Sequence, residues 1–300
     1  MKWRARFFDK CRTAMPRNTA GFPPLHAVFQ PIVRLHGDAI LGYEALIRGP
    51  AGSPLAQPDA LFCHAREIGA AFALECEAAR VALATWSALA LPGKLFLNFS
   101  AQTLRTLLCG AGEGMTDLLT VCGEPVAPER IVIEITEQTA TGDMASFARA
   151  MASLTERGLQ YALDDFGTGH ANLDLLVALS PQFVKIDKSL VRGIDGCPRR
   201  KEILRAMLRM MRAIGGEVIA EGIEDAAALA AVRKLGVAAA QGYYIGGPDA
   251  TGGKGALRSG QADINCCTWR AMTCDGSRGA AGTTGTATSS VRALSSTSSR

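Results

Sequence analysis

Seven polar residues between positions 44 and 241 each stand near the carboxyl end of a short apolar run. Four of them carry carboxylates, and the others carry an amide or an amine. Carboxylate and amide oxygens are the ligands that Mg²⁺ and Mn²⁺ prefer, and they differ from the sulfur and nitrogen ligands of zinc sites. If the seven converge, the pattern predicts metal-assisted hydrolysis at a phosphorus centre. They are Glu44, Asn98, Glu134, Asp164, Lys185, Glu221 and Gln241.

The strongest single signal is the pair Asp164-Asp165, which ends an apolar run and is followed by a turn containing Gly167 and Gly169. Adjacent like charges at the end of a buried strand are costly unless a cation neutralises them. A dinucleotide-phosphate loop fits less well, because Asn172 stands where that fingerprint has its third glycine. Asp165 is positioned to bring in a second ion, and paired ions about 3.5–4 Å apart activate a water between them. The alternative is an exposed Asp-Asp turn of the kind that follows many strands.

Lys185 has two interpretations. At the edge of an acidic cluster, its ammonium would orient the attacking water or offset negative charge on the phosphorus centre. Alternatively, it forms a structural ion pair with Asp187 or another acid.

These residues can meet only if the strands that carry them share one edge. Strand-like and helical segments alternate along the chain, which predicts βα units and a mainly parallel sheet. Eight strand candidates favour a closed (β/α)8 barrel, in which the carboxyl ends of the strands form one rim. The first two strands are separated by His36-Gly37-Asp38, a hairpin connection that makes them antiparallel. The predicted strands are 26–33, 40–47, 95–99, 131–135, 161–164, 183–187, 217–221 and 237–245, and the predicted helices are 60–90 with a break near Gly69, 101–108, 145–157, 172–179, 200–214 and 226–235.

Composition narrows the class of protein. The chain has 300 residues, 48% of them hydrophobic, which suits one large α/β barrel or two ordinary domains. Its net charge of +4 gives no footprint for binding a nucleic acid polymer. Its nine cysteines follow no CxxC or Cys/His zinc spacing, so we expect reduced thiols in a cytoplasmic protein. The longest apolar stretch, 81–91, is too short to span a bilayer, and no membrane span is expected.

Eight sequence blocks, in order, resemble the signature blocks of the EAL-domain cyclic di-GMP phosphodiesterases, and Glu44-Ala45-Leu46 is the tripeptide that gives that family its name. The resemblance covers about residues 26–247, and we place the domain at 26–248. The blocks are Phe29-Gln-Pro-Ile-Val33, Tyr43-Glu-Ala-Leu-Ile-Arg48, Asn98-Phe-Ser100, Glu134-Ile-Thr-Glu137, Asp164-Asp-Phe-Gly-Thr-Gly169, Val184-Lys-Ile-Asp187, Ala220-Glu-Gly222 and Gln241-Gly-Tyr243.

The resemblance implies a modified TIM barrel with one antiparallel strand. It also implies hydrolysis of cyclic di-GMP to linear pGpG with two Mg²⁺ or Mn²⁺ ions, and a loop after Asp165 that couples metal binding to formation of a homodimer. Residue by residue, it implies metal ligation by Glu44, Asn98, Glu134 and Asp164, support of the second ion by Asp165 and Glu221, contact of Lys185 with the nucleophilic water, substrate binding by Arg48 and Gln241, and support of the loop by Glu137.

The chain departs from the family pattern at two places. His170 stands where the family has an aromatic residue, and Gly247 replaces the usual basic residue before Pro248. Residues 249–300 are rich in Gly, Ser, Thr and Ala and show no periodicity, so we predict a disordered tail in place of the final helix. Residues 1–25 are predicted to form a basic arm. The alternatives to an enzyme are a receptor that binds cyclic di-GMP without turnover and, because of the tail, an unstable and silent fragment.

Overall fold

The structure is a computed structural model that describes residues 22–108, 113–121, 124–136, 144–167 and 173–253. All of these residues belong to the first of two units into which the chain divides, Met1–Ala262. Glu137 and His170 lie outside the described residues, as does most of the loop after Asp165. None of the described helices is both long and apolar enough to cross a membrane.

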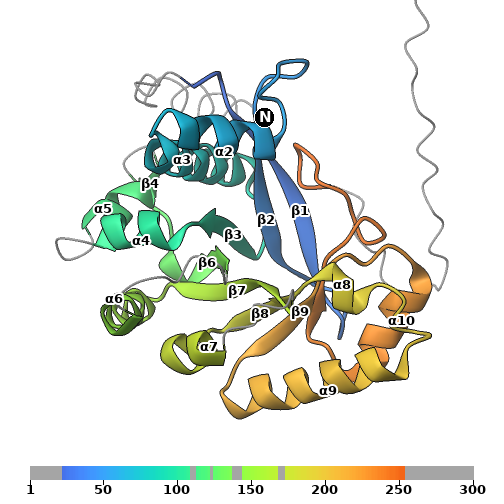
Figure 1. Cartoon of the computed structure of the whole chain (residues 1–300). Helices are drawn as coiled ribbons and strands as arrows, with labels where there is room; N and C mark the ends of the chain where they lie inside the picture. Colours follow the sequence, from blue (N-terminus) through green and yellow to red (C-terminus); the bar gives the residue numbers. More distant parts are fainter. Residues whose placement is uncertain (1–21, 109–112, 122–123, 137–143, 168–172, 254–300) are drawn as a thin grey trace, which may run out of the picture. The chain divides into compact units, whose positions relative to one another are not determined.

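Eight strands close into a barrel around which the helices are arranged (Figure 1), as the alternating pattern predicted. Neighbouring strands are parallel except at β1, which is antiparallel to both β2 and β10. The prediction of a barrel with one antiparallel strand is therefore confirmed. In their order around the barrel, the strands are β1 (His26–Arg34), β10 (Ala239–Ala240), β9 (Glu217–Ala220), β8 (Phe183–Ile186), β7 (Gln160–Phe166), β6 (Ile131–Thr136), β3 (Lys94–Phe99) and β2 (Ile40–Arg48).

The helices bury apolar faces against the outside of the barrel. On α9, for example, Leu204, Leu208 and Met211 recur at helical spacing and are buried. Gly69 separates α2 from α3 as predicted, and it adopts a positive φ of 70°. The helices are α2 (Pro58–Glu67), α3 (Ala71–Leu89), α4 (Ala101–Leu108), α5 (Glu113–Leu118), α6 (Met144–Glu156), α7 (Leu173–Leu179), α8 (Lys188–Val191), α9 (Pro198–Ala213) and α10 (Ala226–Leu235), with a 3-10 turn η1 (Pro128–Arg130) and a small hairpin of β4 (Thr120–Val121) and β5 (Glu124–Pro125).

The barrel interior contains an apolar layer to which each strand contributes one residue. These side chains are almost fully buried and form a cluster separate from the one between strands and helices. Two of them, Phe96 and Phe183, have ring centroids 5.7 Å apart. The layer consists of Ile32, Leu41, Phe96, Val132, Ala162, Phe183, Ile219 and Ala239.

The predicted last strand, 237–245, is wrong at both ends, because β10 contains only Ala239 and Ala240. The chain then turns at Gly242, where a Cβ atom would lie 2.2 Å from the backbone nitrogen of Ile223. Ile223 donates to the Gln241 carbonyl over 3.1 Å and accepts from Tyr244 N–H over 3.0 Å. The apolar run 243–245 therefore forms a turn instead of extending the strand, with Tyr244 and Ile245 packed against the core and Tyr243 exposed.

The tail was predicted to be disordered from residue 249, but the fold extends beyond that residue. Asp249 forms an antiparallel bridge with Phe29, through hydrogen bonds of 2.8 and 3.1 Å between their backbones. Its side chain then accepts from Thr251 N–H over 2.7 Å, which closes a turn. Residues 249–253 are thus part of the fold, because β1 still offers backbone groups that need partners. Residues 254–300 lie outside the described part of the chain.

Candidate functional site

A polar layer lies directly above the apolar interior layer, toward the carboxyl ends of the parallel strands. Because strand side chains alternate with a period of two, the residue two positions after each apolar interior residue also faces inward. On six strands that residue is one of the predicted site residues. The pairs are Phe96 and Asn98, Val132 and Glu134, Ala162 and Asp164, Phe183 and Lys185, Ile219 and Glu221, and Ala239 and Gln241.

Strand β2 reaches the same layer through an irregularity. Its register against β1 shifts so that Ile32 pairs with Gly42 but Val33 pairs with Ile40, which leaves Leu41 as an extra residue. This β-bulge lets Leu41 lie in the apolar layer and Glu44, three positions later, lie in the polar layer.

Lys185 is at the centre of the polar layer, with its side chain only 1% exposed. Its Nζ lies 3.2 Å from Glu44 Oε2, 2.8 Å from Glu134 Oε1, 3.1 Å from Asp164 Oδ1 and 2.7 Å from Glu221 Oε1. Of the alternative ion pairs, the one with Asp187 is wrong, because the Asp187 carboxylate instead accepts from Ser189 N–H over 2.8 Å and begins α8, whereas ion pairs of Lys185 with other acids are present. The structure therefore brings together, from four different strands, the acids that the sequence predicted.

The cluster raises the pKa of three of its members. Burial opposes the charged form of Lys185, but the four surrounding carboxylates outweigh it and raise the pKa of Lys185 well above its ordinary value. Burial raises the pKa of Glu134 well above the ordinary range, and the negative charges of Glu44 and Asp164 add to this. Burial likewise raises the pKa of Glu221 to about 8. One ammonium is therefore too little positive charge for these acids.

Glu44 shows the opposite behaviour. Burial raises its pKa, but Lys185 and hydrogen bonds from Gln241 and Asn98 together lower the pKa below the ordinary value. Asn98 Nδ2 donates to Oε1 over 3.1 Å, and Gln241 Nε2 donates to Oε2 over 2.6 Å. Glu44 is thus held ionised and oriented, and the Asn98 donation leaves that amide's oxygen as its metal-binding atom.

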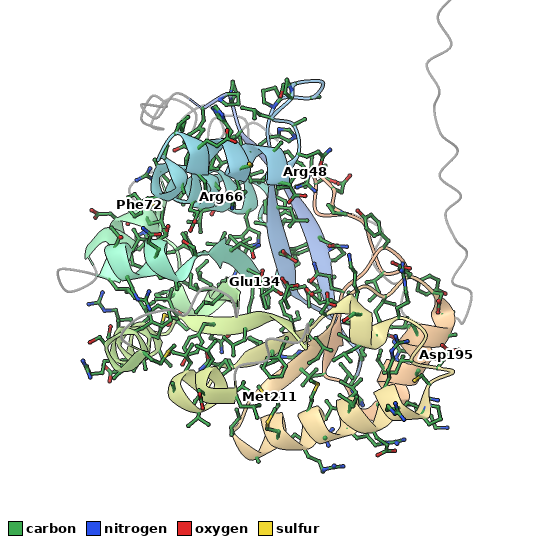
Figure 2. All side chains as sticks on the ribbon, in the orientation of Figure 1. Arg48, Arg66, Phe72, Glu134, Asp195 and Met211 are labelled. Carbon is green, nitrogen blue, oxygen red and sulfur yellow. The ribbon has the colours of Figure 1, made fainter. Side chains whose placement is uncertain are left out.

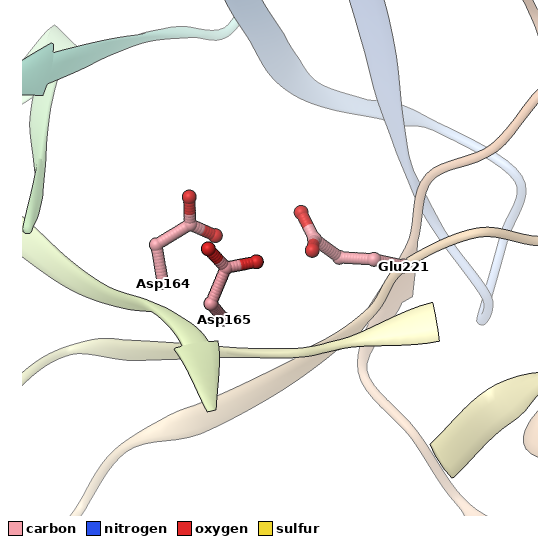
Figure 3. A group of neighbouring side chains, drawn as sticks. All are labelled: Asp164, Asp165 and Glu221. Carbon is pink, nitrogen blue, oxygen red and sulfur yellow. The ribbon is translucent and has the colours of Figure 1, made fainter. Parts of the chain in front are cut away.

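The adjacent Asp164 and Asp165 both face the site because the strand is irregular there. The pairing of β7 with β8 shifts between Leu163 and Phe166, and Asp165 has a φ of 56°, in the left-handed region. This conformation breaks the alternation that would otherwise send neighbouring side chains to opposite faces. Figure 3 shows the carboxylates of Asp164, Asp165 and Glu221 directed toward one another, with one potential ligand atom from each within 4.8 Å of the others.

Several buried oxygens of the site have no hydrogen-bond partner among the described residues. Both carboxylate oxygens of Glu134, Asp164 Oδ1 and Gln241 Oε1 are in this state, although Glu134 Oε1 and Asp164 Oδ1 lie at ion-pair distance from Lys185. Unsatisfied buried acceptors are costly, and a cation satisfies several at once. These hard oxygen donors fit a divalent ion of the Mg²⁺ or Mn²⁺ type.

The sequence interpretation missed Gln30. This buried residue accepts from Gln241 Nε2 over 2.9 Å and donates to the Gly246 carbonyl over 3.1 Å. The signal was available, since Gln30 lies two residues before the interior Ile32 on the antiparallel strand and pairs directly with Glu44. Through these two hydrogen bonds, Gln30 connects Gln241 to Gly246, which follows the turn after β10.

Of the other predicted residues, Arg48 has a hydrogen bond within its own strand. Arg48 ends β2, is half-buried and donates to the carbonyl of its neighbour Ile47 over 2.9 Å. In Figure 2, Arg48 lies at the end of β2, whereas Glu134 lies among the barrel strands. Glu137, predicted to support the loop after Asp165, is outside the described residues.

The fold and the site together define an α/β barrel whose mouth concentrates acids suited to divalent cations. The chain belongs to the EAL domain family, whose model matches residues 23–248. Members of this family include cyclic di-GMP phosphodiesterases.

Three comparisons illustrate the relationship. The chain is 28% identical over 224 residues to the cyclic di-GMP phosphodiesterase RocR of Pseudomonas aeruginosa, covering 74% of this chain and 57% of that protein. It is 27% identical over 199 residues to the blue light- and temperature-regulated antirepressor BluF of Escherichia coli, covering 66% and 48%. The manganese and cyclic di-GMP complex of Klebsiella pneumoniae BlrP1 superposes with a TM-score of 0.67 at 27% identity, covering 78% of this chain and 58% of that one. Among the curated relatives compared, the match spans 15% to 57% of the relative's own length.

Proposed function

We propose that this chain hydrolyses cyclic di-GMP to linear pGpG with the help of two Mg²⁺ or Mn²⁺ ions. The observation that supports this most directly is the polar layer itself, in which carboxylates from four strands surround the buried Lys185. Relatives named as cyclic di-GMP phosphodiesterases, and a related structure that contains manganese with cyclic di-GMP, support the choice of substrate and ion class.

Charge balance supports two ions. With all groups ionised, the carboxylates of Glu44, Glu134, Asp164 and Glu221 surround the ammonium of Lys185, which leaves three of these negative charges uncompensated. One divalent ion would supply only two positive charges, so a second ion is needed to neutralise the third. The raised pKa values of Glu134 and Glu221 are consistent with this, because these acids retain protons when no other cation is present.

In this proposal the residues would serve two ions. Glu44, Asn98, Glu134 and Asp164 would hold one ion, and Asp165 and Glu221, which lie close to Asp164, would support the second. Bound ions of this kind activate a water and offset the charge that develops on the phosphodiester.

The chain's own residues would orient the reaction. Lys185 would keep its proton, since its pKa is raised, and would donate a hydrogen bond to the attacking water. Arg48 would hold a phosphate of the substrate, which its planar guanidinium can bind through two hydrogen bonds. Gln241 would keep Glu44 oriented while the water loses a proton and adds to phosphorus. The 3′ oxygen would leave and take up a proton, which yields the 5′ phosphate and the free 3′ hydroxyl of pGpG.

The test measures conversion of cyclic di-GMP to pGpG by the purified full chain with Mg²⁺ or Mn²⁺. Glu44→Ala should abolish turnover, whereas Glu202→Gln, which changes a carboxylate exposed on α9, should leave it within twofold. Chelation of the metal should stop turnover reversibly. Tight binding of cyclic di-GMP without turnover under either metal would contradict the proposal.

The second candidate is a receptor that binds cyclic di-GMP without hydrolysis. It is favoured by the relationship to BluF, a family relative named as an antirepressor. The same assay separates the two functions, since a receptor retains binding and shows no product.

A further inference from the structure

Helix α3 buries a carboxylate that the proposed chemistry does not use. Among the buried residues of α3, all of which the structure describes, only Glu75 is charged, and it is 8% exposed. No Lys or Arg in the described part of the chain forms an ion pair with it. A buried carboxylate without a cation is unfavourable unless hydrogen bonds satisfy it.

Glu75 is satisfied by the residue that follows β3. Its Oε2 accepts from Ser100 N–H over 2.8 Å and from Ser100 Oγ–H over 3.1 Å. Ser100 Oγ in turn accepts from Thr103 N–H over 3.2 Å, which caps α4, and the Ser100 carbonyl accepts from Leu104 N–H. The carboxylate also lies at the amino end of α4, where the helix dipole favours a negative charge.

The bond from Ser100 N–H to Glu75 holds the backbone at the point where the chain leaves β3. Phe99 is the last residue of β3 and pairs with Ile135, and the next N–H donates to Glu75 instead of to a strand. Asn98 lies two residues before this tether, and its amide donates to Glu44 over 3.1 Å. A helix outside the barrel is therefore connected to Glu44 through Ser100 and Asn98.

We propose that Glu75 is a positioning residue for the metal-binding mouth, because its carboxylate holds Ser100 where Asn98 faces Glu44. This inference rests on the proposed function, in which Asn98 and Glu44 bind the same ion. Glu75 itself touches neither substrate nor metal in this account. A purely structural role would be limited to capping α4.

The two roles are separated by a matched pair of variants. Glu75→Met keeps the length and apolar stem of the side chain but removes both acceptors. Ser100→Ala removes the cap of α4 while keeping the Ser100 N–H bond to Glu75. Both should lower the urea midpoint of the full chain, but only Glu75→Met should weaken binding of Mn²⁺, by tenfold or more in titration calorimetry. Ser100→Ala should stay within threefold of the unmodified chain.

A conservative substitution of Glu75 and a double-mutant cycle with Asn98 provide two further tests. Glu75→Gln keeps one acceptor for Ser100 N–H and should bind Mn²⁺ within threefold of the unmodified chain. If Glu75 acts through Asn98, adding Glu75→Met to Asn98→Ala should weaken Mn²⁺ binding less than twofold further. Independent, additive losses in the cycle, or equal losses in Glu75→Met and Ser100→Ala, would overturn the proposal. Should Glu75→Met fail to fold, Glu75→Ala takes its place in the same comparison.

The outcome does not depend on catalysis. A chain that binds Mn²⁺ but produces no pGpG would contradict the proposed function and still test Glu75 through metal affinity. A chain that binds no Mn²⁺ can be tested by a crystal structure of the Glu75 variant. There, Asn98 Nδ2 more than about 3.5 Å from Glu44 Oε1 would support the positioning role, since that distance is the limit of a hydrogen bond. An unchanged contact would overturn it.

Discussion

Two adjacent layers inside one barrel show how the same strands serve stability and chemistry. The apolar layer contains residues such as Phe96, Ile219 and Phe183, and the polar layer above it contains Glu134 and Lys185. Burial alone does not distinguish the centre of the polar layer from the apolar layer, since Glu134 and Lys185 are each 1% exposed. The difference lies in what burial does, because it stabilises the apolar side chains and destabilises ionised ones. The lower layer holds the barrel closed, and the upper layer concentrates ionisable groups whose charged forms burial opposes.

The largest effect should come from removing Lys185, the one cation among the described residues of the polar layer. Lys185→Met should abolish turnover, by at least about 10³-fold, because both the positive charge and the donor to the water are lost. It should also destabilise the metal-free protein by about 3–5 kcal/mol, since removing one partner leaves buried charges uncompensated. Urea unfolding with chelator and with Mn²⁺ measures this, and Mn²⁺ should restore part of the loss. Lys234→Met, on the surface of α10, should change neither quantity. A stable, active Lys185→Met variant would contradict the role of the cluster.

A substitution in the lower layer should have the complementary effect. Phe96→Ala removes a fully buried ring that packs against Phe183, and it should cost about 3–5 kcal/mol of stability. Turnover per folded molecule should fall much less than in Lys185→Met, because no site residue is removed. Denaturation curves and single-turnover assays on the same sample check both quantities. A complete loss of turnover in a folded Phe96→Ala protein would show that the two layers are not separable.

Most of this arrangement could be predicted from the sequence, because the spacing of the strands and the types of residue at their ends both indicate one polar site at the mouth of a barrel. Glu134, Asp164, Lys185 and Glu221 could be placed at one mouth from their positions at the ends of apolar runs, and the structure brings them together. The two-residue alternation of side chains along a strand also places Gln30 in the polar layer. Its strand runs in the opposite direction, however, so Gln30 precedes the apolar interior residue Ile32 instead of following it.

Other features depend on tertiary contacts that periodicity does not report. The length of β10 is set by the close approach of Gly242 to Ile223, so the apolar run 243–245 gave a false strand signal. Asp249 was assigned to a disordered tail because its segment is polar and rich in glycine, yet the free backbone of Phe29 gives it a partner. The bond from Ser100 N–H to Glu75 could not be predicted for the same reason, since it joins a strand end to a helix through one side chain.

A change of pH should distinguish the layers without any mutation. In the folded, metal-free protein Glu221 keeps its proton up to a pKa of about 8, whereas in the unfolded chain it loses the proton near its ordinary value of 4.5. Between these values the folded state binds more protons, so stability should fall as pH rises from about 4.5 to 8. Saturating Mn²⁺ should remove this dependence, because the ion takes the place of the proton. Urea midpoints across this range, with and without Mn²⁺, test the sign, and Glu221→Gln should flatten the metal-free curve. A metal-free stability that rises with pH would contradict the assignment.

The smallest effect should come from an ion pair outside the barrel, which isolates the contribution of burial. Arg233 and Asp38 lie 2.6 Å apart, closer than Lys185 lies to any of its four carboxylates, but their side chains are 44% and 43% exposed. Water screens such a pair, so Arg233→Met should cost only about 0.2–1 kcal/mol, and less in high salt. Turnover should not change. Urea unfolding at low and high salt measures the cost, beside Lys185→Met in the same buffers. Equal costs for the two substitutions would mean that the distance between the charges, and not burial in a low-dielectric interior, determines how much Lys185 contributes to stability.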